Sequence, residues 1–121
     1  MNIIICGAGK VGFSISKQLS AQGHSVTVID QSSEDIKKSN DTQDVKGIVG
    51  RATLPTVLEN AGAEKADMVI AVTRNDETNM IVCQLASSLF NVSKKIARIR
   101  TQDFLEGKWG KLYNKSNIPI D

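Results

Sequence analysis

The stretch IIICGAGKVG, residues 3–12, decides the fold of this chain. Three isoleucines and a cysteine, typical of a buried strand, lead directly into Gly7, Gly9 and Gly12. Glycines at this spacing allow a tight turn, a close approach of the backbone to a pyrophosphate, and close packing of the following helix on the strand. The stretch therefore predicts a strand, a phosphate-binding turn and the first turn of a helix, in that order.

An acidic residue stands where such a unit binds ribose. Asp30 ends the second apolar run, VTVID, and follows Gly12 by 18 residues. A carboxylate there accepts ribose hydroxyls and repels a 2′-phosphate, and the following Gln31 and Ser32 supply no arginine to receive one. The pattern favours NAD(H) over NADP(H). The alternative is a tight turn and an acidic strand end in a fold that binds nothing.

Short β-branched runs alternate with longer helical periods along the chain, without internal repeats. We expect strands at 3–6, 26–29, 46–49, 67–72, 96–100 and 118–120, and helices at 11–22, from 32 onward, and at 54–61, 76–91 and 103–114. Strands that alternate with helices pair in parallel, with right-handed crossovers. The expected fold class is α/β: one Rossmann-like domain over 1–121, a doubly wound parallel six-stranded sheet in the order 3-2-1-4-5-6 with helices on both faces.

Composition excludes several classes of protein. The 121 residues are 40% hydrophobic and 23% charged, with a formal charge of +2, which is too small for a nucleic-acid binder. No apolar run approaches the roughly 20 residues that span a bilayer, and no signal peptide is recognisable. Two distant cysteines without a secretory signal favour a reducing, cytoplasmic location, and a single histidine argues against a His/Cys metal site.

Other expected strand ends carry further candidate ligand contacts, because ligands of open α/β sheets lie beyond the carboxyl ends of the strands. Thr73 and Arg74 follow the expected fourth strand, and we expect this connection to face the glycine loop across the crevice. Arg98 and Arg100 end the fifth strand, and their spacing places both on one side of the sheet. Phosphate would pair these arginines; the alternative is a structural salt bridge with a neighbouring acid.

Lys10 invites comparison with a P-loop, but that motif needs glycine where Ile4 stands and Ser or Thr where Val11 stands. Lys10 is left as a phosphate contact or a solvated lysine. We find no set of residues for catalysis, since Cys6 and Cys83 fall in an expected strand and an expected helix, both typical places for structural thiols.

Four stretches in this order and spacing resemble the KTN or RCK-N nucleotide-binding domains of Trk-type potassium-uptake regulators: MNIIICGAGKVG, VTVIDQ, ADMVIAVTRNDETNM and KKIARIR. DETNM and ARIR are more specific than the glycine loop, which unrelated dehydrogenases share. The resemblance implies nucleotide contacts from Gly7, Ala8, Gly9, Lys10, Val11 and Gly12, from Asp30, from Thr73 and Arg74, and from Arg98, with Arg100 as a weaker addition.

The resemblance also implies a function. Members of this family bind NAD(H) or ATP, form homo-oligomeric rings beneath a membrane-embedded potassium transporter on its cytoplasmic side, and change shape to set potassium flux. They normally continue into a second subdomain, whereas this chain ends at Asp121, so the resemblance implies a domain without its C-terminal RCK part.

Two hypotheses follow: a nucleotide sensor that gates potassium uptake and is not an enzyme, and the cofactor half of an NAD-dependent oxidoreductase. The second lacks a substrate domain and a proton-transfer residue. We also expect a homodimer through an apolar stripe on the last helix; the bland alternative is that the stripe packs on its own sheet. The stripe comprises Phe104, Leu105, Trp109 and Leu112.

Overall fold

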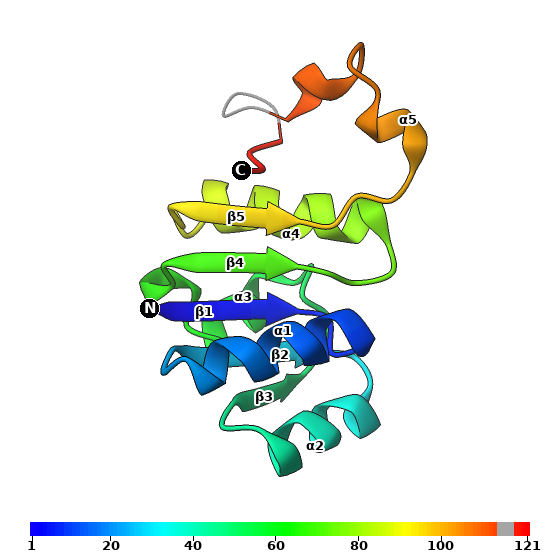
Figure 1. Cartoon of the computed structure of the whole chain (residues 1–121). Coiled ribbons are helices and arrows are strands. Elements are labelled where there is room, and N and C mark those ends of the chain that lie inside the picture. The colour runs from blue at the N-terminus through cyan, green and yellow to red at the C-terminus, as the bar shows by residue number, and fades with distance from the viewer. Residues whose placement is uncertain (114–117) are drawn as a thin grey trace.

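The computed structural model describes residues 1–113 and 118–121. Its core is a five-stranded parallel sheet in the order β3-β2-β1-β4-β5, with helices on both faces (Figure 1). The strands are β1 (Asn2–Cys6), β2 (Ser25–Asp30), β3 (Lys46–Val49), β4 (Met68–Ala71) and β5 (Lys94–Ala97). The helices are α1 (Lys10–Ala21), α2 (Ser33–Thr42), α3 (Pro55–Asn60), η1 (Ala63–Lys65), α4 (Asp76–Ser88), α5 (Gln102–Leu105) and η2 (Gly110–Leu112).

The central strand β1 is buried on both faces of the sheet. Ile3 and Ile5 pack on the side of α1 and α2, whereas Ile4 and Cys6 pack on the side of α3 and α4. This alternation follows from the two-residue period of a strand, and each fully buried isoleucine contributes about 1.5–3 kcal/mol. The run of isoleucines thus joins the two hydrophobic layers through a single strand.

Local signals in the sequence set several helix boundaries. The side chain of Ser32 caps α2 by accepting a hydrogen bond from the backbone N–H of Asp35, and Asn75 caps α4 in the same way. Pro55 opens α3, where its missing N–H costs little. None of the described helices is long and apolar enough to cross a membrane.

The fifth strand begins earlier than the sequence predicts, at Lys94 rather than Ile96, and ends at Ala97. A lysine at position 95 does not look like a buried strand residue, but in the structure its side chain is buried. Its Nζ donates hydrogen bonds to the carbonyl oxygens of Val92 at 2.9 Å and Ser93 at 3.2 Å. Arg98 and Arg100 therefore follow the strand instead of ending it, although the N–H of Arg98 still donates to the carbonyl of Ala71 at 2.9 Å.

The predicted sixth strand is wrong for residues 118–120, which lie in the described part of the chain and form no strand. The chain does return to the edge of β5, since the N–H of Asp121 donates to the carbonyl of Lys95 at 2.7 Å. Pro119 has no N–H to add to a ladder, and one backbone hydrogen bond does not make a strand. The sheet therefore has the order 3-2-1-4-5 rather than 3-2-1-4-5-6.

The predicted helix over 103–114 is also wrong. Within it the structure has only α5 and η2, separated by a turn that contains Gly107; Asn114 lies outside the described residues. The expected stripe is therefore not one helix face. Leu105 and Trp109 are 52% and 47% exposed, and this segment arches away from the sheet in Figure 1.

Gly12 is the glycine that the packing of α1 on the sheet requires. A Cβ atom at this position would lie 1.7 Å from the backbone oxygen of Gly7, which no side-chain adjustment can relieve. We expect Gly12→Ala to lower the free energy of unfolding by at least the roughly 1–3 kcal/mol of an overpacked core. Urea unfolding measures this. Gly107→Ala is the control, because its Cβ would meet nothing within 4 Å; an equal effect of both variants would contradict the packing role of Gly12.

Candidate functional site

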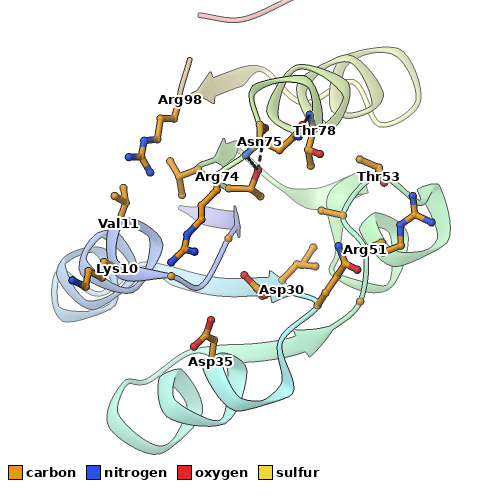
Figure 2. A pocket seen from close by; sticks show the side chains of 18 of the residues that line it. Lys10, Val11, Asp30, Asp35, Arg51, Thr53, Arg74, Asn75, Thr78 and Arg98 are labelled. Carbon is orange, nitrogen blue, oxygen red and sulfur yellow. Dashed lines mark hydrogen bonds between the residues drawn. The ribbon is translucent and has the colours of Figure 1, made fainter. Parts of the chain in front are cut away.

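A cleft of about 630 Å³ lies beyond the carboxyl ends of the strands (Figure 2). Its walls are the β1–α1 turn, the end of β2 with the start of α2, the segment that follows β3 (residues 50–53), and the segments that follow β4 and β5. Nine of the eleven predicted site residues line it: Gly7, Gly9, Lys10, Val11, Asp30, Thr73, Arg74, Arg98 and Arg100. The other two, Ala8 in the turn and Gly12 in the first turn of α1, are buried and do not line the cleft.

The first two glycines of the turn do different things. Gly7 has a φ of +116°, and a Cβ there would lie 2.9 Å from the backbone oxygen of Val72, so Gly7 lets β1 turn against the end of β4. Gly9 has an ordinary φ of −70°, and a Cβ there would meet nothing within 4 Å. The fold does not require Gly9, so its place on the cleft wall points to close approach by a ligand.

The N-terminus of α1 differs from those of the other long helices. Ser32 and Asn75 cap α2 and α4 with their side chains, and both helices carry two acids in the first turn. Gly9 offers α1 no side-chain cap, and its first turn has no acid. The unpaired N–H groups and the positive end of the helix dipole consequently face the cleft, an arrangement that binds anions.

Asp30 joins the turn to the second wall. One of its carboxylate oxygens accepts a hydrogen bond from the N–H of Ala8 at 2.7 Å, and the other accepts one from the N–H of Ser32 at 2.8 Å. Each oxygen keeps further acceptor capacity for a ligand hydroxyl. Asp35 also lines this wall, with its carboxylate directed into the cleft in Figure 2, so one end of the cleft is acidic.

The opposite end is basic. Arg74 extends across the cleft toward the start of α1, and the guanidinium of Arg98 lies beside Val11 (Figure 2). Arg100 lines the cleft and also a shallower hollow beside it. The guanidinium groups of these three arginines make no salt bridge with any residue of 1–113 and 118–121, so the structural salt bridge considered as an alternative is not present there. Lys10 points away from this group in Figure 2.

Arg74, Arg98 and Arg100 form an arginine wall of the cleft. Two polar residues hold its backbone in place, and the sequence had suggested no role for either. Asn79 is completely buried, and its amide bonds the backbone of both Thr73 and Arg98. The carboxylate of Asp76 accepts hydrogen bonds from the N–H groups of Arg100 and Thr101 at 2.9 and 2.7 Å. The signal was present in DETNM: two polar residues three apart fall on the otherwise apolar face of a helix.

The two cysteines are buried outside the cleft lining and are not reactive. Burial raises the pKa of the Cys6 thiol far above its usual range and that of Cys83 to about 12, so both thiols stay protonated and unreactive. Within residues 1–113 and 118–121, no group of His, Cys, Asp and Glu residues could hold a metal ion. The arrangement can bind a ligand with hydroxyls at one end and negative charge at the other.

Comparison with known proteins identifies the family of this site. The family model described as the TrkA-N domain matches residues 3–114. The Trk system potassium uptake protein TrkA of Azorhizobium caulinodans is 46% identical over all 121 residues, which correspond to 26% of its own length. The chain thus spans about a quarter of that relative.

Two solved structures share the fold. The Kef CTD of Shewanella denitrificans, in an AMP-bound form, is 25% identical with a TM-score of 0.74 and matches over 87% of this chain and 65% of its own. The GsuK channel bound to NAD is 20% identical with a TM-score of 0.77, over 98% of this chain and 21% of its own. The second likeness concerns the fold alone.

Asp76 makes stability depend on pH in a defined direction. Hydrogen bonds from Thr101 and from the backbone N–H of Arg100 hold the pKa of this carboxyl below its usual value. The unfolded chain then takes up the proton more readily, so acid favours unfolding. We expect the stability advantage of the native chain over Asp76→Asn to be full above about pH 5 and to shrink below about pH 4. Urea unfolding of both proteins from neutral to acidic pH measures this, and parallel curves would contradict it.

Proposed function

The chain belongs to the TrkA-N domain family, and we propose that it is the nucleotide-binding regulatory domain of a Trk-type potassium transport system. In this proposal it binds NAD(H), or ATP and ADP in the same cleft, and couples the nucleotide state to gating of potassium uptake. The observation that carries the proposal is the uncapped N-terminus of α1, which lies between the carboxylate of Asp30 and a wall of three arginines.

The charge pattern of the cleft suits an adenine nucleotide in one orientation. The ribose hydroxyls donate to Asp30, and the first phosphates lie at Gly9 and the following N–H groups of α1. A 2′-phosphate would meet Asp30 and Asp35 together, which disfavours NADP(H). The AMP-bound form of the Shewanella relative supports an adenine nucleotide as the ligand class.

The arginine wall lies where the remainder of the ligand must extend. In ATP and ADP, Arg74, Arg98 and Arg100 would meet the outer phosphates; in NADH they would meet the second phosphate and the ribose beyond it. Charge-assisted hydrogen bonds of this kind are roughly twice as strong as neutral ones. Both ligands share the adenosine half, so they compete for one cleft, and the domain responds to their ratio.

Regulation requires that the ligands bind two shapes of an assembly with different affinities. We propose that the domain acts as a homo-oligomer, a dimer or a larger ring, at the cytoplasmic side of a membrane-embedded potassium transporter. The exposed side chains of Leu105 and Trp109, at 52% and 47%, give α5 and the turn after it an apolar surface for such contacts. The proposal includes no catalytic step, in line with a relative named as a potassium uptake protein.

Binding calorimetry tests the ligand. We expect saturable binding of NADH, ATP and ADP to the native domain, and weaker binding of NADPH. Gly9→Ala should weaken NADH binding about tenfold or more, because a methyl group would separate the backbone from the phosphates. A tenfold rise in Kd corresponds to a loss of about 1.4 kcal/mol of binding free energy. The urea midpoint should not fall, because a Cβ at Gly9 meets nothing within 4 Å. Absence of any heat at millimolar nucleotide would remove the proposal.

Arg98→Ala tests the arginine wall. Loss of one charge-assisted hydrogen bond of about 1.5–3 kcal/mol should weaken NADH and ATP binding roughly tenfold to a hundredfold. The urea midpoint should stay unchanged, because the guanidinium has no salt-bridge partner in the described chain. Lys94→Ala, an exposed cation at the other end of β5, is the matched control and should alter neither value. A lower midpoint with unchanged affinity would make Arg98 structural.

A further inference from the structure

The buried face of α4 carries two polar side chains, Asp76 and Asn79, among apolar neighbours. They are 6% and 0% exposed, and their three-residue spacing puts both on one side of the helix. Burying such groups is costly unless they are hydrogen-bonded. Their side-chain hydrogen bonds all go to the segments after β4 and β5, which form the arginine wall of the cleft.

The amide of Asn79 is fully bonded. Its Oδ1 accepts from the N–H of Thr73 at 3.0 Å and from the Thr73 hydroxyl at 2.6 Å. Its Nδ2 donates to the carbonyl oxygens of Thr73 at 3.1 Å and Arg98 at 2.8 Å. A backbone N–H can only donate and a carbonyl can only accept, so these partners fix the orientation of the amide. One side chain therefore ties the chain after β4 to the chain after β5.

Asp76, one helical turn before Asn79, also bonds the chain after β5. Its two carboxylate oxygens bond the N–H groups of Arg100 and Thr101. After Arg98 the chain leaves the sheet, and side chains of α4 then take the place of a strand partner. The positions of Arg98 and Arg100 along the cleft thus depend on α4 rather than on the sheet alone.

The acidic end of the cleft is held by different bonds. There Asp30 joins Ala8 and Ser32, and neither Asp76 nor Asn79 takes part. The cleft therefore has two separately anchored halves: a ribose half around Asp30 and an arginine half around Arg98 and Arg100.

From this we infer that Asp76 and Asn79 are positioning residues for the arginine half, which set the affinity for the part of a nucleotide beyond its first phosphate. The inference rests on the proposed function. A purely structural role would lower stability and would change the affinity for short and long nucleotides alike. A positioning role changes the affinity for long nucleotides selectively.

Calorimetry with AMP, ATP and NADH separates the two roles. We compare the native domain with Asn79→Leu, which keeps a side chain of similar size but loses all four hydrogen bonds, and with Asp76→Asn, which keeps a side chain of the same shape but loses the negative charge. Both variants should bind ATP and NADH at least about tenfold more weakly, while AMP affinity stays within about twofold. Asp76→Asn carries the test if Asn79→Leu does not fold.

Lys95→Met is the matched control. Lys95 is also buried, bonds backbone carbonyls and lies in β5 itself, but at the end of the strand remote from the cleft. It should lower the urea midpoint and leave the ratio of AMP to ATP affinity unchanged. An unchanged ratio in both α4 variants would overturn the positioning role and leave the proposed function standing. A native domain that binds none of the three nucleotides would overturn both.

Discussion

The contact between Gly12 and the backbone oxygen of Gly7 is the constraint on which the rest of the structure depends. Only a residue without a Cβ allows α1 to start this close to the end of β1. As a result, the first turn of α1 lies at the carboxyl ends of the strands, and no side-chain cap stands between its N–H groups and the cleft. One backbone geometry thus serves the packing of α1 and, in the proposed function, nucleotide binding. Gly12 allows this geometry, and Gly9 leaves the backbone exposed to the cleft.

Asp30 extends the same geometry to the neighbouring strand. By bonding Ala8 and Ser32, its carboxylate fixes the turn after β1 relative to the start of α2. These bonds also orient the carboxylate, because its two oxygens face two different loops. Asp30, predicted from the sequence only as a ribose acceptor, is therefore a structural tie, and replacing it would disturb both loops.

The sequence was most informative where one local rule decided the outcome. The β1–α1–β2 unit could be predicted because glycine spacing, the apolar runs and Asp30 all point to one fold, and the start of α2 agrees with the side chain of Ser32 as its cap. The C-terminal third could not. The register of β5 depends on a buried lysine bonded to nearby carbonyls, and the path after it depends on side chains of a distant helix. The bonds of the lysine leave no periodic trace. Those of the helix show in the sequence only as two polar residues on an otherwise apolar helix face, which does not reveal their partners.

The two halves of the cleft are held by different kinds of contact, and this matters for how ligand binding could change the rest of the domain. The half of the cleft around Asp30 is built from short local connections to the central strands β1 and β2. The arginine half lies after the edge strand β5, and two side chains of α4 hold it in place. Beyond it the chain runs directly into α5 and the exposed Leu105 and Trp109. In the proposed function, a ligand that pulls on Arg98 or Arg100 therefore acts on a segment held by α4 rather than by a strand partner. The end of the cleft proposed to distinguish one nucleotide from another would then also be the end placed to report the difference.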